Sequence, residues 1–449
     1  MEKFQEAIEK NLEWFKNSGV LEEEGRQGVH ERVWLLRSDH PLVNGDGRYD
    51  DGIIKYRRVD CALETALAFE YGDELFPNRG YSEISENLRK FVRNTPFQIT
   101  DHNHPEFGLY AHGLTFVGGF PQKFIDDKNP IVRHHEGKHY FWDKKWVDDN
   151  SWVVILTLGR LMRKKDQNIE LSDEDKTDAN KAFLTAEALI DKTEILRSYC
   201  RGQLDGVPHW GGMRVMALAF AYSASLDERF REAALKFLQP DIEKIDDFRK
   251  GKAKAPYDMS NCGYFSMIGS SLMHSIKNQD IENSVETVVD YLLKNQSDIG
   301  HWPGEWWEGS SGENVADLVY GQNWTTLGLQ AYAQLRGDLR VEAAVRKSLD
   351  FLASIQNNSN FPKTNGAWLG SYDVKRKTWG GEDRKEGGPS CIYTGWTNAP
   401  IDLAFISEVT KKRNIIIPSH TREPSSNKPT LRDSLIDLST EYSRRSTPY

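Results

Sequence analysis

With 449 residues, 38% of them hydrophobic, the chain can bury a large core. Its formal net charge of −9 argues against a nucleic-acid or anionic-membrane surface, and no run approaches the roughly 18 apolar residues that span a bilayer. Because the first residues follow an amphipathic helix pattern instead of a signal-peptide pattern, we expect a cytoplasmic protein without nucleic-acid or membrane partners.

Helical periodicity dominates the chain and comes in two kinds. In the first kind a charged face opposes an apolar one, as where Glu282 and Glu286 alternate with Val285, Val288 and Leu292. These outer helices are expected at residues 1–17, 81–93, 174–195, 227–238, 280–295 and 340–356.

The second kind of helix is apolar or small on nearly every face and must therefore be buried on most sides. Such helices are expected at residues 57–71, 148–164, 211–223, 261–275, 317–334 and 397–409. A weak repeat of about sixty residues, seen between Asp290–Gln296 and Asp350–Gln356, fits one helical hairpin per unit. The alternation predicts an all-α fold, an (α/α)6 barrel of six hairpins closed into a double ring.

The connections that lead into the buried helices are long, so the long loops should all lie at one end of the ring. Long loops on a rigid scaffold are where function concentrates. We expect one catalytic domain over residues 1–410, with a long loop insertion around 94–147. Residues 411–449 are rich in Pro, Ser, Lys and Arg without periodicity, which predicts a polar C-terminal extension.

Most histidines and tryptophans of the chain fall in these loops or at the helix starts that follow them. Sugar rings stack on flat aromatic side chains while their hydroxyls bind polar groups, so this composition indicates an aromatic-lined sugar cleft. Alternatively, some of the tryptophans only pack loops against the barrel. The candidate substrate-binding residues are Asp60, Glu64, His112, His209, Trp210, Asn261, Trp302, Trp306, Tyr320, Gln322, Trp324, Tyr393 and Trp396.

Two adjacent carboxylates, Asp148 and Asp149, stand where the second buried helix begins. A helix start stabilises negative charge, so one of them could be only an N-cap. Glycoside cleavage, however, needs two carboxyl groups, and repulsion between neighbouring aspartates raises the pKa of one of them. Asp60 and Glu64 are the next carboxylates to consider, unless they form a buried pair that answers Arg57 or Arg58.

The segment Asp148-Asp149-Asn150-Ser151-Trp152 resembles the paired-aspartate segment of bacterial and fungal α-1,6-mannanases. Together with six hairpins, it resembles the six-hairpin glycosidase superfamily, in which unsaturated glucuronyl and rhamnogalacturonyl hydrolases also place an aspartate at such a position. The fold-level resemblance covers about residues 1–410, and the motif covers about ten residues. The resemblance implies a glycoside hydrolase that acts on an oligosaccharide, with Asp148 and Asp149 as the catalytic pair.

Three other functions remain open from the residues alone. A polysaccharide lyase on the same ring would transfer protons through Tyr320, Tyr393, His112 or His209. A terpene-cyclase-like ring would need an Asp-x-Asp-Asp motif, whose first aspartate is missing at Trp146, and a non-catalytic sugar-binding ring is also compatible.

We expect no metal and no cofactor, because the four cysteines are far apart and the loop histidines set no tetrahedral spacing. The sequence does not indicate the sugar, the anomeric outcome or the oligomeric state. It also leaves open which of the two aspartates is the acid.

Overall fold

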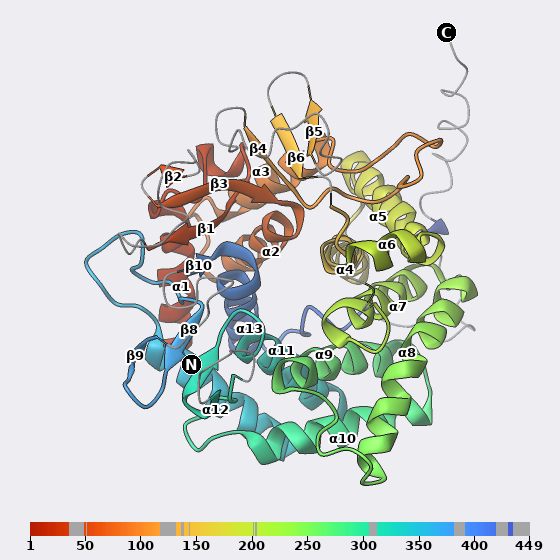
Figure 1. Cartoon of the computed structure of the whole chain (residues 1–449). Coiled ribbons are helices and arrows are strands. Elements are labelled where there is room, and N and C mark those ends of the chain that lie inside the picture. The colour runs from red at the N-terminus through yellow and green to blue at the C-terminus, as the bar shows by residue number, and fades with distance from the viewer. Residues whose placement is uncertain are drawn as a thin grey trace.

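The chain folds into an inner and an outer ring of helices, as Figure 1 shows for the computed structural model. The outer helices are α1 (Glu2–Asn17), α3 (Tyr81–Asn94), α5 (Asp173–Asp191), α8 (Glu228–Arg249), α10 (Gln279–Asn295) and α12 (Leu339–Ile355). The inner helices are α2 (Val59–Leu75), α4 (Val147–Asp166), α7 (Met213–Ser225), α9 (Met259–Ser275), α11 (Gln322–Arg336) and α13 (Ala399–Thr410). The structure describes residues 1–35, 49–50, 52–116, 132–135, 139–142, 144–200, 202, 204–304, 312–380, 391–418 and 430–433.

The inner ring is closed. Each inner helix contacts the next, and α13 returns to α2, while α1 packs on α13 to complete the sixth hairpin. In α9 nearly every residue is buried, whereas α10 buries one stripe that includes Val285, Val288 and Leu292. These burial patterns follow the two kinds of periodicity in the sequence. The predicted all-α fold, an (α/α)6 barrel, is confirmed.

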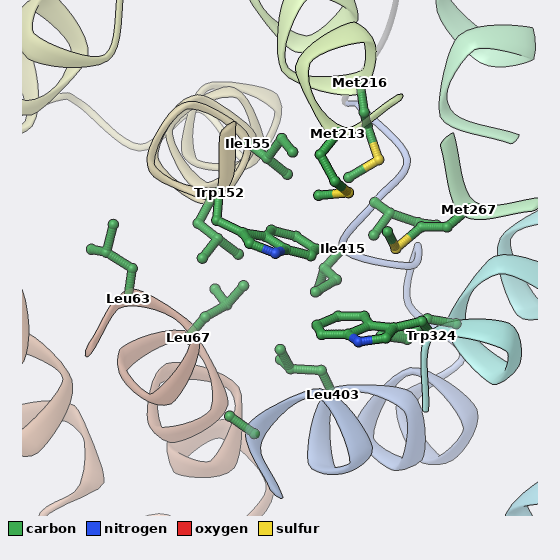
Figure 2. Close-up of a cluster of buried hydrophobic side chains, with 14 of the residues drawn as sticks. Leu63, Leu67, Trp152, Ile155, Met213, Met216, Met267, Trp324, Leu403 and Ile415 are labelled. Atoms are coloured by element: carbon green, nitrogen blue, oxygen red, sulfur yellow. The ribbon is translucent and has the colours of Figure 1, made fainter. Parts of the chain in front are cut away.

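Apolar side chains fill the space between the inner helices. Figure 2 shows Trp152 of α4 and Trp324 of α11 facing each other, with Leu403 and Ile415 beside them, and the two indoles stack at 5.2 Å between ring centroids. Protein interiors of this kind are close-packed. The centre of the barrel is therefore filled by packed side chains, and functional residues are expected at the ends of the helices.

The long connections contain strands, where the sequence analysis expects only loops. A seven-stranded antiparallel sheet has the order β10-β1-β3-β4-β6-β5, with β2 paired to β3. Its strands are β1 (His30–Trp34), β2 (Tyr49–Asp50), β3 (Ile53–Arg58), β4 (Gly113–Phe116), β5 (Val132–His135), β6 (His139–Trp142) and β10 (Cys391–Tyr393). A smaller sheet joins β7 (Val315–Asp317), β8 (Ser371–Asp373) and β9 (Thr378–Trp379). Because β3 runs directly into α2, the larger sheet positions the first inner helix start.

Two stretches differ from the prediction within the helical part. Helix α8 continues to Arg249 instead of ending at residue 238. Pro240 removes one backbone N–H, yet the helix persists because Leu238, Asp241 and Ile245 remain buried at helical spacing. The connection after α5 holds a further short helix, α6 (Thr193–Tyr199).

The chain after α13 begins as a buried segment, in contrast to the polar extension expected from residue 411. Ile415, Ile416 and Ile417 are buried, and the Asn414 Nδ2 donates to the Leu327 carbonyl oxygen of α11 at 3.1 Å. Further on, Leu431 is also buried in the core. This apolar run covers one end of the packed barrel. Among the described helices, none combines the length and the hydropathy needed to cross a membrane.

Candidate functional site

The guanidinium of Arg58 gathers three carboxylates where β3 runs into α2. Its Nε and Nη2 donate to the two oxygens of Asp60 at 3.1 and 2.8 Å, and its Nη1 lies 3.3 Å from Glu31 Oε1. Nη2 also donates to Asp149 at the start of α4. All four side chains are buried, and the planar fork of arginine suits such bidentate contacts. One cation thus joins the starts of the first two inner helices.

Asp149 has a second partner in His112, which precedes β4. The His112 Nδ1 lies 2.6 Å from Asp149 Oδ2. Burial and the nearby Arg58 charge lower the pKa of His112 to about 3, so its imidazole is neutral near pH 7. A neutral imidazole with Nδ1–H directed at a carboxylate leaves Nε2 as a proton acceptor. The pair therefore has the arrangement of a histidine base held by an acidic side chain.

Asp148 differs from its neighbour in both exposure and bonding. It is half-buried whereas Asp149 is fully buried, and its Oδ1 has no hydrogen-bond partner among the described residues. Burial and the adjacent Asp149 raise the pKa of Asp148 well above its ordinary value. A carboxyl group in this state holds its proton more tightly than an ordinary aspartate and can act as a proton donor.

Trp396, which precedes α13, closes the group on the side of α2 that faces away from α4. Its indole N–H donates to Asp60 Oδ2 at 2.8 Å, its backbone N–H donates to Glu64 Oε2 at 2.8 Å, and the Arg58 guanidinium lies 3.9 Å from its ring centroid. The residue has φ +49°, a left-handed conformation that is strained for a bulky side chain. The preceding Gly395 is required, since a Cβ there would lie 2.6 Å from Glu64 Oε2.

Burial and the neighbouring Asp60 charge raise the pKa of Glu64 well above its ordinary value. The pKa of Asp60 is lowered, because Arg58 and the Trp396 indole outweigh the effect of burial. The two carboxyl groups share a face of α2, yet their pKa values are shifted in opposite directions.

Aromatic rings connect the helix starts in a continuous series, which we call the aromatic arc. All of its members except the buried Tyr393 are half-buried. The centroid distances along the arc are Tyr56–His112 5.7 Å, His112–Trp146 6.3 Å, Trp146–Trp210 6.4 Å, Trp210–His209 5.8 Å, His209–Tyr320 5.2 Å, Tyr320–Trp396 5.9 Å and Trp396–Tyr393 5.7 Å.

Two buried asparagines hold parts of the arc in place. The Asn150 Oδ1 accepts from the Tyr110 backbone N–H at 2.7 Å, and this fixes the segment that carries His112. The Asn261 Oδ1 accepts from the His209 backbone N–H at 3.1 Å, while its Nδ2 donates to Asp258 at 2.9 Å. Asn261 therefore acts on the arc through the backbone of His209.

The structure brings together most of the residues that the sequence analysis proposed for the site. We call Arg58, Glu31, Asp60, Glu64, Asp149 and Trp396 the Arg58 cluster. This cluster and the aromatic arc together contain Asp60, Glu64, His112, Asp149, His209, Trp210, Tyr320, Tyr393 and Trp396, with Asp148 and Asn261 beside them.

Three proposed binding residues lie elsewhere. Trp302 is buried and donates its indole N–H to Leu292 of α10, and Gln322 accepts from the Trp302 backbone N–H and donates to Ser348 of α12. Trp324 is part of the core in Figure 2. These side chains hold loops and helices together, which was the alternative reading for some tryptophans. Trp306 lies outside the described residues.

Four residues of the group, Glu31, Tyr56, Arg58 and Trp146, were not proposed as site residues, and two of them lie next to helix starts. Arg58 immediately precedes the helix that carries Asp60, and Trp146 caps the start of α4. Arg58 and Trp146 lie next to helix starts, as the predicted site residues do, and this position could have identified them from the sequence. In the described part of the chain, no group of three or more His, Cys, Asp or Glu side chains is placed to hold a metal ion.

No protein-family model and no curated protein matches the chain. Solved structures do match. A cellobiose 2-epimerase from Bacillus thermoamylovorans B4167 aligns with a TM-score of 0.57 at 14% identity, over 91% of this chain and 100% of that one. An unsaturated glucuronyl hydrolase from Bacillus sp. GL1 aligns with a TM-score of 0.56 at 11% identity, over 93% and 100%.

A D-mannose isomerase aligns with a TM-score of 0.55 at 12% identity, over 91% of this chain and 98% of the other. Likeness at this level of identity concerns the fold, and it extends along nearly the whole chain. The resemblance seen in the sequence is confirmed at that level: the chain has an (α/α)6-barrel fold, like these solved structures.

Proposed function

We propose that the chain is a carbohydrate-active enzyme, and specifically a glycoside hydrolase that cleaves an oligosaccharide. The observation that carries the proposal is the half-buried Asp148 carboxyl, with an unpartnered oxygen, beside the Asp149–His112 pair. The aromatic arc supplies ring faces on which pyranoses stack. The fold likeness to an unsaturated glucuronyl hydrolase supports the same chemistry.

In this proposal Asp148 is the general acid. Its raised pKa keeps the proton that the glycosidic oxygen needs as the bond to the anomeric carbon breaks. The second group is His112, oriented by Asp149, whose Nε2 takes a proton from water as the hydroxyl adds to the anomeric carbon. Asp149 is fully buried and therefore positions His112, while Arg58 donates a hydrogen bond to its other oxygen.

The test is a screen of aryl glycosides and unsaturated uronides with the wild-type chain, followed by Asp148→Asn. We expect this variant to lose turnover by a factor of about 10² to 10⁴ with nearly unchanged thermal stability. Asp149→Asn should lose turnover as well, because an amide changes the bonding of the His112 Nδ1. Asp166→Asn, an exposed position at the end of α4, is the matched control. Full activity of Asp148→Asn would refute the assignment.

A second candidate is a sugar epimerase or isomerase that moves a proton next to a carbonyl carbon. Two histidines of the aromatic arc favour it, because burial lowers the pKa of His112 to about 3 and that of His209 to about 4, so both are neutral bases. The fold likeness to a cellobiose 2-epimerase and a D-mannose isomerase supports it too.

The two candidates separate in deuterated water. Mass spectrometry of reducing sugars incubated with the chain would show deuterium bound to carbon if a proton is exchanged, and hydrolysis leaves that carbon unlabelled. Deuterium incorporation that disappears in His112→Asn, without release of free sugar from any glycoside, would favour the isomerase.

A further inference from the structure

A small cavity with an unusually cationic wall lies between α2, α3, α4 and α5, apart from the aromatic arc. It measures about 20 Å³, which is room for one water molecule or one monatomic ion. Apolar side chains such as Leu63, Val92 and Val153 form part of its wall. The charged members of the wall are Arg89, Arg93, Arg160, Lys181 and Asp178.

The ion pairs around the cavity do not balance its charge. Glu70 accepts from Arg89 and from Arg160 Nε, and Asp175 accepts from Arg160 at 2.8 Å and from Lys164 at 2.7 Å. The other charged side chains of the wall are Arg93, Asp178 and Lys181. The Asp178 oxygens accept from Arg93 at 2.9 and 2.7 Å, the exposed Glu86 lies 3.6 Å from Arg93, and Lys181 Nζ donates to the Arg93 carbonyl oxygen.

Five cationic side chains therefore share four carboxylates in this described part of the chain, an excess of one positive charge. Solvent screens the arginines of the wall poorly, since Arg89 is 5% exposed and Arg160 is 9% exposed. A buried charge without a counter-charge is unfavourable.

Arg89 also has a donor left over. Its Nε is buried and has no hydrogen-bond partner among the described residues, although the side chain lines the cavity. Burial lowers the pKa of Arg89 to about 10, with the Arg160 charge acting in the same direction. An anion in the cavity would accept from this N–H and offset the extra charge.

We propose that the cavity binds a monatomic monovalent anion, and that this anion is chloride under ordinary solution conditions. A phosphate or sulfate is too large for 20 Å³, and a water molecule leaves the positive charge uncompensated. The site joins the outer helices α3 and α5 to the inner helices α2 and α4.

The test compares thermal unfolding of the wild-type chain in sodium chloride and in sodium gluconate at equal ionic strength. Selective binding to the folded state should raise Tm by about 2 °C for each tenfold increase in chloride above the dissociation constant. Arg89→Met should lose this dependence. Arg79→Met is the control, because Arg79 is a half-exposed arginine paired with Glu9 on the surface.

Crystals of the wild-type chain soaked in sodium bromide give a readout that does not depend on the variant folding. An anomalous peak in the cavity between Arg89 and Arg160 would support the proposal. A peak without anomalous signal, which indicates water, or equal Tm values in chloride and gluconate, would overturn it.

Discussion

Contact with Arg58 separates two aspartates that are neighbours in the sequence. Asp149 receives a hydrogen bond from the guanidinium and a second contact from His112, while burial raises its pKa well above the ordinary value. Asp148 has no such bond to Arg58 in the described structure, and the adjacent carboxylate raises its pKa. A general acid needs a carboxyl group that holds its proton and has an oxygen free to meet the substrate, and of these two aspartates Asp148 is the one with an unpartnered oxygen in the described structure. The hydrogen bond from Arg58 to Asp149 therefore distinguishes this residue from Asp148, which is proposed as the acid.

Asp402 of α13 provides a prediction about stability at the scale of one residue. Its side chain is fully buried, both oxygens lack hydrogen-bond partners among the described residues, and burial raises its pKa well above 3.8. The folded state therefore binds this proton more tightly than the unfolded chain does. The contribution of Asp402 to the free energy of unfolding is highest below the pKa that Asp402 has in the unfolded chain. As pH rises, this contribution falls by about 1.4 kcal/mol per pH unit until the pKa of Asp402 in the folded state is passed.

Asp402→Asn should remove this contribution. We expect wild type and variant to have similar free energies of unfolding near pH 3.5 and the variant to be the more stable one at pH 7, as measured by urea denaturation. Asp247→Asn, at a half-exposed position on α8, should change neither curve. Parallel curves for wild type and Asp402→Asn at every pH would contradict the prediction.

The residue types at the helix starts were sufficient to predict much of the site, and the failures have a common cause. Trp324 and Gln322 belong to a helix start like the others, but the helical phase turns them towards the core and towards α12. Likewise, strand alternation sends Arg57 to Glu22 and Arg58 to Asp60. The direction of a side chain depends on where a helix or strand begins, within one residue, and the sequence pattern is not that precise.

At the scale of elements, periodicity predicted the helices of both rings but none of the strands. A helix such as α10 repeats its apolar stripe over several turns, whereas β2 and β9 contain two residues each and β3 contains six. Alternation over so few residues cannot be told from a loop. The larger sheet is therefore visible only through pairings between distant segments, such as β1 with β10.

The link between the segment before β4 and helix α4 gives a prediction at this scale. Asn150 accepts from the Tyr110 N–H and donates to the Tyr110 carbonyl oxygen, and it is fully buried. Asn150→Ala leaves both backbone groups of Tyr110 unpaired, so we expect a loss of about 1–3 kcal/mol in the free energy of unfolding. Hydrogen exchange at the amides of residues 110–112 should accelerate more than the global loss explains, because Tyr110 loses both of its bonds to α4, while the His112 N–H keeps its bond to the Lys144 carbonyl oxygen.

Ser151→Ala is the matched control for that experiment. Ser151 is the next residue and is equally buried, but its hydroxyl donates only to Val147 within the same helix. The variant should be nearly neutral and should leave exchange at residues 110–112 unchanged. If Asn150→Ala behaved in the same way, the proposed anchor would not exist.

At the scale of the whole molecule, the first helix closes the ring against the last. The Asn11 Nδ2 donates to the Gly366 carbonyl oxygen and to Asn398 Oδ1, both at 2.8 Å, and the Trp14 indole donates to Lys363 at 2.9 Å. Phe4 packs on Phe405 of α13. An open array of hairpins could unfold stepwise from its ends, as repeat proteins do, but a closed ring has no free end.

Asn11→Ala tests whether this closure makes the ring a single cooperative unit. Removing the amide takes away two buried hydrogen bonds at about 0.5–1.5 kcal/mol each, although Gly366 still accepts from Gln356 and Asn398 from Trp368, and it weakens the contact between the first and last hairpins. Thermal unfolding followed by far-ultraviolet circular dichroism and by tryptophan fluorescence should shift to lower temperature by the same amount with both probes, because tryptophans are distributed around the ring. Asn17→Ala, on the exposed end of the same helix, should shift neither probe. Separate transitions in Asn11→Ala would mean that the hairpins unfold independently, and the stability of the site at their helix starts would then depend on local contacts around Arg58 alone.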